Sequence, residues 1–156
     1  MSNALKRRIK QTADFESPAV EAMLNLMVAA DHVRALVDRI CSGFGITRGQ
    51  YNVLRILRGA EREGHPRCEI AARMVESAPD VTRLLDRLEN QELVLRERSD
   101  EDKRHSVARI SEKGLRLLEE IEPELKAMHD ALSERLSIAE CVALSHICEK
   151  IYDEAA

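Results

Sequence analysis

The fold is decided within residues 69–114, which read EIAARMVESAPDVTRLLDRLENQELVLRERSDEDKRHSVARISEKG. Apolar residues recur there at the three- and four-residue spacing of an amphipathic helix: Val81, Leu84, Leu85 and Leu88. After Leu93 the period changes to two, in VLRER (94–98) and again in SVARI (106–110), with a polar segment between them. The stretch therefore predicts one regular helix followed directly by a β-hairpin.

Start signals place two more helices before this one. Thr47 and Gln50 have the types and spacing of a capping box, which predicts a helix that begins here and ends before Gly64. A shorter helix is expected over residues 67–75. Its inward-facing residues are expected to be Ile70, Ala71 and Met74.

Ser77 and Asp80 form a second capping pattern. We expect the regular helix to begin there, with Pro79 in its first turn, where a missing N–H costs nothing. The order helix, short helix, helix and hairpin is typical of a winged helix-turn-helix. We therefore predict that fold, with the hairpin as its wing.

A winged helix-turn-helix places one helix in the major groove of DNA, where its outward side chains reach bases and phosphates. The outward residues of the helix opened by Ser77 are Thr82, Arg83, Asp86 and Arg87. The turn of the hairpin adds a cationic cluster suited to the negative minor groove: Lys103, Arg104 and His105. The sequence thus predicts binding to double-stranded DNA, and Ser77, Pro79 and Asp80 are further candidate contacts at the start of the helix.

These residues resemble the MarR family of bacterial regulators. The matching segments are VTRLLDRLE (81–89), Leu93-Val94, Asp102-Lys103-Arg104 and SEKG (111–114). Residues 46–57, ITRGQYNVLRIL, are similar to the preceding helix of the family. The resemblance implies a homodimer whose first and last helices interlock and whose two lobes grip a pseudo-palindromic operator. It assigns DNA contacts to Thr82, Arg83, Lys103 and Arg104, and it implies that Arg87 pairs with Asp102 to hold the wing.

The chain departs from the family pattern just before this run. Small hydroxyl residues are common there, whereas this chain has Pro79 and Asp80. Because an aspartate facing a phosphate repels it, we expect Asp80 to cap the helix. The alternative is that Asp80 accepts a hydrogen bond from a cytosine amino group.

The cationic residues also have less specific interpretations. The alternative for Arg83 and Arg87 is that both are solvated helix arginines that pair with Asp86 or Glu89. The basic cluster near the N-terminus is more typical of a solvated arm, of one or two helical turns, than of a DNA contact.

Long helical regions flank the predicted lobe. Ser17-Pro18 begins the first, whose apolar residues fall on two faces, a pattern typical of a helix that packs on its own core and on a second subunit. In the second region Pro123 is expected to kink or restart the helix, and Ser137 opens a last helix. The expected fold is mainly α, with a small β-hairpin wing and long N- and C-terminal dimerisation helices. The expected parts are an arm (1–16), a dimerisation helix (17–45), the DNA-binding lobe (46–111) and C-terminal dimerisation helices (112–156).

Overall charge does not favour DNA binding, because the chain carries a formal net charge of −4. Residues 112–156 hold five basic and eleven acidic side chains, so we expect this region to lie away from phosphate. The prediction therefore depends on individual arginines. No apolar run is long enough to span a membrane and no secretory signal is evident, so we expect a cytoplasmic protein without membrane contacts.

A small-molecule effector is a further expectation from the family resemblance, since the family often binds lipophilic or aromatic anions between the dimer helices and the DNA lobe. The candidate contacts are Met23, Met27, His32 and Tyr51. Periodicity alone assigns these residues to the core, and Tyr51 is also placed to form a hydrophobic staple with Ile46.

Other chemistry is weakly indicated. The four cysteines form no CxxC pair, and we expect them to be reduced and structural: Cys41, Cys68, Cys141 and Cys148. The sequence has no phosphate-binding glycine loop, nucleophile elbow or metal-ligand spacing, so we expect no enzymatic activity, no cofactor and no metal.

We expect a transcriptional regulator, acting as a repressor and modulated by an effector. The alternatives are a redox-sensing regulator acting through a cysteine and a dimeric winged-helix module that binds protein.

Overall fold

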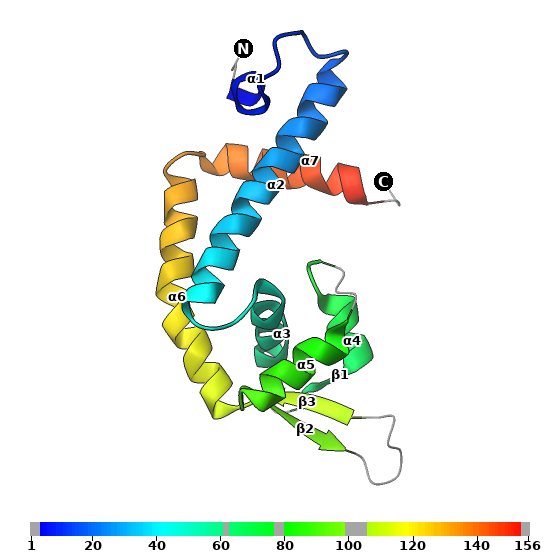
Figure 1. The fold of residues 1–156 in the computed structure, drawn as a ribbon, viewed down its shortest axis with the longest axis vertical. Helices are drawn as coiled ribbons and strands as arrows, with labels where there is room; N and C mark the ends of the chain where they lie inside the picture. The colour runs from blue at the N-terminus through cyan, green and yellow to red at the C-terminus, as the bar shows by residue number, and fades with distance from the viewer. Residues whose placement is uncertain (1–3, 61–62, 77–79, 99–105, 154–156) are drawn as a thin grey trace. The chain divides into compact units, whose positions relative to one another are not determined.

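The computed structural model describes residues 4–60, 63–76, 80–98 and 106–153. In this part of the chain helices dominate and the strands form one small sheet (Figure 1). The chain divides into two compact units, Met1–Arg39 and Ile40–Ala156. The predicted fold class, mainly α with a small hairpin, is confirmed.

The first unit contains α1 (Ala4–Ile9) and most of α2 (Pro18–Gly43). The short helix expected in the N-terminal arm is therefore present. The hydroxyl of Ser17 accepts a hydrogen bond from the backbone N–H of Val20 at 3.3 Å, so α2 begins where the sequence predicted.

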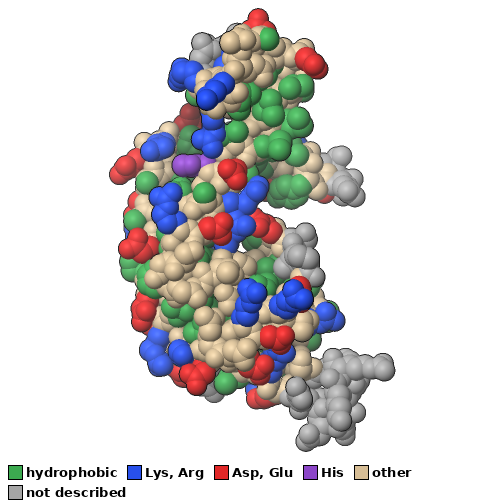
Figure 2. Space-filling view, viewed as in Figure 1, with side chains coloured by type: hydrophobic (Ala, Val, Ile, Leu, Met, Phe, Trp, Pro, Cys, Tyr) green, Lys and Arg blue, Asp and Glu red, His purple; other side chains and the backbone are tan. Residues whose placement is uncertain are grey.

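Much of the apolar surface of α2 is exposed in the single chain. Periodicity assigned Met23 and Met27 to the core, yet both are exposed, as is Val33. Figure 2 shows hydrophobic side chains gathered over the N-terminal half of this helix. The pattern leaves α2 with apolar surface available to another molecule.

The second unit contains the predicted lobe. Its elements are α3 (Arg48–Gly59), β1 (His65–Pro66), α4 (Arg67–Arg73), α5 (Val81–Asn90), β2 (Val94–Arg98) and β3 (Ser106–Ile110). The sheet is antiparallel in the order β1-β3-β2, and the hairpin strands β2 and β3 have the predicted bounds. The largest fully buried side chains come from helices and sheet alike: Val53, Leu54, Leu57, Ile70, Leu88, Val94 and Ile121, with Cys41. One core therefore fixes α5 against the rest of the lobe.

The sheet has a third strand that sequence analysis did not predict. In β1, His65 pairs with Ala108 and Pro66 with Val107. Two residues are too few to show a period of two, and Pro66 argues against a strand except at an edge. β1 is at the edge of the sheet, which accommodates the proline.

The short helix α4 differs from its prediction. It ends at Arg73 rather than at Val75, because Met74 is already extended, with ψ at 134°. Ile70 faces inward as expected, but Ala71 is exposed.

After the lobe come α6 (Glu112–Ser133) and α7 (Ile138–Tyr152). Each helix begins after a serine cap: Ser111 accepts from the N–H of Gly114 at 3.0 Å, and Ser137, where the sequence predicted a helix start, forms a capping box with Glu140. α6 continues through Pro123 without a restart, and its axis bends along its length (Figure 1). α7 buries none of its side chains within the single chain.

Candidate nucleic-acid interface

The helix expected to enter a DNA groove is α5. It begins at Val81 because Asp80 is its N-cap: Oδ1 of Asp80 accepts the backbone N–H of Arg83 at 3.0 Å. The predicted start at Ser77 is therefore wrong by three residues. The capping role expected of Asp80 is confirmed, although Asp80 is the cap itself rather than the third helical residue.

The two faces of α5 are divided as the sequence predicted. Its buried residues are Val81, Leu85 and Leu88, on the side that contacts α3, α4 and β2. Its exposed face carries Thr82, Arg83, Asp86 and Arg87. A rigid helix thus presents polar and cationic side chains to solvent from an apolar base, which suits groove binding.

The two arginines of this face differ in their contacts. Nε of Arg83 lies 2.9 Å from Oδ2 of Asp80, while the Arg83 side chain remains 79% exposed. Arg87 is exposed, and its side chain has no ion pair or hydrogen bond with another described residue. Its expected partner, Asp102, lies outside the described residues, so the pair that was to hold the wing stays a prediction.

Arg96 of β2, which sequence analysis did not single out, fastens the ribbon to α5. Its Nη2 lies 2.5 Å from Oδ1 of Asp86 and 3.4 Å from the carbonyl oxygen of Thr82, and its Nε lies 3.4 Å from Oε2 of Glu89. The side chain is only 18% exposed. A signal was available, because a period of two places Arg96 on the same face of the strand as the buried Val94. Asp86 and Glu89 are therefore partners of Arg96, not of Arg83 or Arg87.

Replacing Arg96 by methionine is expected to lower the free energy of unfolding by about 1 kcal/mol, because the change removes charge-assisted contacts from a largely buried side chain. Urea denaturation of the full chain measures the effect. The matched control is Lys126→Met, which removes the exposed Lys126–Asp130 pair of 2.7 Å on α6 and is expected to cost less than about 0.5 kcal/mol. Equal losses in the two variants would contradict a fastening role for Arg96.

The C-terminal end of α5 is held by a hydrogen-bond chain. Gln91, its C-cap, donates from Nε2 to the carbonyl of Gly45 at 3.1 Å and accepts at Oε1 from Nε2 of Gln50 at 3.0 Å. Gln50 is buried and its Oε1 accepts the N–H of Thr47 at 2.9 Å. Nζ of Lys113 donates to the carbonyl of Gln91 at 2.8 Å. Groups from the α2–α3 loop, α3 and α6 therefore fix the direction in which α5 points.

Several candidate DNA contacts fall outside the described residues. They are Ser77, Pro79, Lys103, Arg104 and His105. The strands that lead to the hairpin tip are ordered by pairing and by an ion pair across them, with Nη1 of Arg109 2.6 Å from Oε1 of Glu97. The described part of the wing thus forms a braced ribbon next to α5.

The candidate effector contacts lie in different units. Met23, Met27 and His32 are exposed residues of the first unit, whereas Tyr51 is half-buried in α3 of the second. Burial raises the pKa of the Tyr51 phenol, and the guanidinium of Arg55 lies 6.0 Å from the ring centroid. Tyr51 therefore keeps a neutral hydroxyl that can donate a hydrogen bond at neutral pH.

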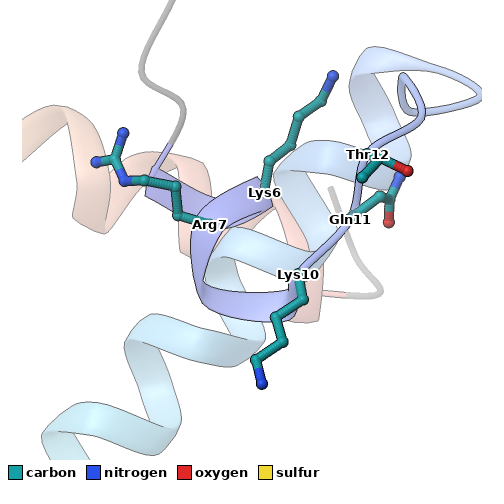
Figure 3. Close-up of a pocket in the computed structure, with 5 residues that line it drawn as sticks. All are labelled: Lys6, Arg7, Lys10, Gln11 and Thr12. Atoms are coloured by element: carbon teal, nitrogen blue, oxygen red, sulfur yellow. The ribbon is translucent and has the colours of Figure 1, made fainter.

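A hollow in the first unit is lined by Lys6, Arg7, Lys10, Gln11 and Thr12 (Figure 3). The side chains of Lys6 and Arg7 on α1 and of Lys10 just after it point in different directions, and none of the expected effector contacts lines the hollow. Lys6 is also engaged elsewhere, since its Nζ lies 2.5 Å from Oδ1 of Asp14 and 5.7 Å from the centroid of the Phe15 ring. The hollow does not have the converging groups of an anion site.

The cysteines occupy different environments. Cys41 is buried, Cys68 is exposed, and Cys141 and Cys148 are half-buried. Redox sensing through one of them stays a prediction. Within the described residues, His, Cys, Asp and Glu side chains form no group of three that could hold a metal ion. Each helix in this part of the chain is too short or too polar to cross a bilayer.

Comparisons with known proteins agree with this geometry. The MarR family model matches residues 46–106. The HTH-type transcriptional regulator MhqR of Bacillus subtilis (strain 168) is 28% identical over 107 residues, 69% of this chain and 72% of MhqR. The MepR–DNA complex of S. aureus shares the fold at 22% identity, with a TM-score of 0.71 over 88% of this chain and 97% of that one.

A crystal structure of a MarR transcription factor from Planctomyces limnophilus is more similar in sequence. It is 36% identical, with a TM-score of 0.69, and the match covers 87% of this chain and 98% of that protein. Such identity over nearly the whole of a known member places this chain, by sequence and by fold, in the MarR family of transcription regulators.

Proposed function

We propose that the chain is a transcriptional repressor that binds a pseudo-palindromic operator as a homodimer. The observation that carries the proposal is the exposed face of α5, where Thr82, Arg83 and Arg87 project from a helix whose other side is buried. An exposed helix of this kind beside a β-ribbon has the shape that the major groove admits. Family membership supports the same conclusion.

The wing supplies the second set of DNA contacts in this proposal. Lys103, Arg104 and His105 follow β2 and precede β3 in the sequence, so they belong to the segment that joins the two strands. Cations on a narrow ribbon suit the minor groove, where the negative potential is deepest. Ser77, Pro79 and Asp80, just before α5, complete the residues that we propose take part in DNA binding, Asp80 through its contacts with Arg83.

Dimerisation is proposed from apolar surface that the single chain leaves exposed. On α7 the exposed apolar residues are Ile138, Val142, Leu144, Ile147, Ile151 and Tyr152. Figure 2 shows hydrophobic side chains near the C-terminal end of this helix. The methionines Met23 and Met27 of α2 are exposed as well, and exposed apolar side chains on a helix are typical of a surface that binds another protein. Two α5 helices related by two-fold symmetry then match half-sites about 34 Å apart, and the bound dimer covers promoter DNA.

Regulation by a small lipophilic or aromatic effector completes the proposal, with Met23, Met27, His32 and Tyr51 as its contacts. The dimer has two states in this proposal, one whose α5 spacing matches the operator and one whose spacing does not. An effector that binds the mismatched state more tightly favours release of DNA, and its effect on DNA affinity is limited by the difference between its affinities for the two states. A screen of aromatic acids and phenols against operator binding tests this part. Unchanged affinity throughout the screen counts against it.

A salt titration of DNA binding tests the proposed function. The affinity for operator DNA is expected to fall steeply with rising salt, because lysines and arginines displace counterions from phosphates. Arg83→Ala is expected to weaken binding by about tenfold, since it removes a groove contact. Fluorescence anisotropy with labelled duplex measures both effects.

The control for Arg83→Ala is Arg135→Ala, which removes the same charge from the exposed turn between α6 and α7. This variant is expected to change the affinity by less than about twofold, because distant surface charges are largely screened. If DNA binding is undetectable, or if both variants bind as the native chain does, the protein-binding alternative replaces the proposal.

A further inference from the structure

The carboxylate of Asp80 makes two contacts with the same arginine. Oδ1 accepts the backbone N–H of Arg83 at 3.0 Å, and Oδ2 lies 2.9 Å from Nε of its side chain. One acidic residue therefore caps the N-terminus of α5 and also holds the guanidinium of Arg83. The Arg83 side chain is nevertheless 79% exposed, so its outer edge remains available to a partner.

Competing carboxylates on α5 are occupied. Asp86 and Glu89 are both engaged by Arg96, which approaches from the ribbon. Asp80 is thus the acidic residue that the described structure pairs with Arg83. Arg87, one turn further along the helix, has no such anchor among the described residues.

The way in which Arg83 is held favours one kind of DNA contact. An unrestrained arginine loses considerable side-chain entropy when it adopts a single geometry, and an arginine held at Nε has already lost part of it. The N–H groups of Nη1 and Nη2 have no hydrogen bond with another described residue, and they can donate in parallel to a partner. Guanine offers a matching pair of acceptors, O6 and N7, on its major-groove edge.

The charge of the Asp80–Arg83 pair also favours a base contact over a phosphate contact. The Asp80 carboxylate offsets the positive charge of Arg83, which weakens attraction to a phosphate, whose binding depends on charge. A directed bidentate hydrogen bond depends on geometry and is weakened less. The pair is therefore better suited to reading a base than to holding the backbone.

We propose that Asp80 orients Arg83 to read a guanine in the major groove, so that each half-site of the operator contains one G·C pair specified by this arginine. The inference rests on the proposed function and adds to it a specificity determinant. Asp80 acts here as a positioning residue, and Arg83 makes the contact.

Selection of bound duplexes from a randomised library by the full-length protein tests the inference. Two variants separate the roles: Asp80→Ser keeps a good helix cap but is too short to reach Nε, and Arg83→Lys keeps the charge but loses the bidentate fork. The native chain is expected to enrich guanine at one position of each half-site. Arg83→Lys is expected to reduce that preference by about tenfold.

Asp80→Ser is expected to reduce the preference for guanine at the same base pair by about threefold. The loss is smaller than for Arg83→Lys because the arginine that makes the bidentate contact is still present. Asp80→Ser is expected to have no further effect in the Arg83→Lys background, because the residue that Asp80 positions is already gone. Asp80→Asn, which also caps well, serves as a second variant if the serine variant is poorly folded. Circular dichroism of each variant verifies that α5 is retained.

The outcomes are distinguishable. If the native protein enriches no sequence and binds DNA without salt dependence, the proposed function itself fails. If it selects an operator but Asp80→Ser and Arg83→Lys select the same one with equal stringency, the inference is overturned while the function stands. If the two variants change preference at different base pairs, Asp80 reads a base itself, and the positioning role is overturned.

Discussion

Replacing Val142 by glutamate is expected to convert the protein into a monomer and to weaken operator binding by about 100-fold or more, because two linked lobes bind far more tightly than one. Val142 lies on α7 and is 64% exposed in the single chain, where a glutamate is tolerated. In a dimer interface the same glutamate is buried without a partner, which costs several kcal/mol. Light scattering coupled to size-exclusion chromatography measures the mass, and anisotropy measures the affinity.

The control for Val142→Glu is Val75→Glu, which places the same charge at a residue that is 87% exposed in the lobe, before α5. This variant is expected to leave the mass of the native dimer unchanged, because Val75 lies outside both proposed dimerisation helices. A Val142→Glu protein that keeps the native mass shows that α7 is not part of the interface. A native protein with the mass of a single chain excludes the dimer altogether.

Local signals in the sequence were sufficient for most of the fold. The capping boxes at Thr47 and Ser137 are satisfied by hydrogen bonds between residues three apart, so their chemistry depends little on distant parts of the chain. The hairpin strands were equally predictable, because the change of period at Leu93 reflects a change in which side chains are buried. Local chemistry therefore determined where these elements begin.

The start of α5 shows how two local signals can compete. Ser77 and Asp80 both have the side chain of an N-cap, and the sequence alone favoured the first. A cap at Ser77 requires residue 78 to be helical, yet that residue precedes Pro79, and the helical conformation is disfavoured before proline. Giving this rule more weight than the capping-box pattern would have predicted Asp80.

Contacts between elements were beyond the sequence. The period of two places Arg96 on the buried face of its strand, but nothing local indicates that its partners are Asp86 and Glu89, because the pairing depends on how the ribbon lies against α5. β1 is similar: His65 and Pro66 become a strand only because β3 passes beside them. Individual capping and strand residues of the candidate site were therefore predictable, whereas the contacts between elements that hold these residues in position were not.

The turn that leads into β1 gives the second large effect. Gly64→Ala is expected to lower the free energy of unfolding by about 3 kcal/mol. The alanine would have to adopt a left-handed backbone conformation, and its Cβ atom would clash with neighbouring atoms. Gly64 has φ of +69°, and a Cβ atom there lies 2.3 Å from the carbonyl oxygen of Ala108 and 2.9 Å from Cγ1 of Val107. The Ala108 oxygen belongs to the backbone of β3, the strand that pairs with β1, and it cannot move aside without opening the sheet. Urea denaturation at one fixed protein concentration measures the loss.

Gly59→Ala is the matched control, since Gly59 is the last residue of α3 and a Cβ atom there meets nothing within 4 Å. In a helix this change is expected to raise stability by about 0.5–1 kcal/mol, because alanine loses less backbone entropy than glycine. The two substitutions add the same methyl group and differ in sign only through the backbone around them. If Gly64→Ala is as well tolerated as Gly59→Ala, then β1 does not approach β3 as closely as the structure indicates, and the edge that supports the wing is looser than its pairing implies.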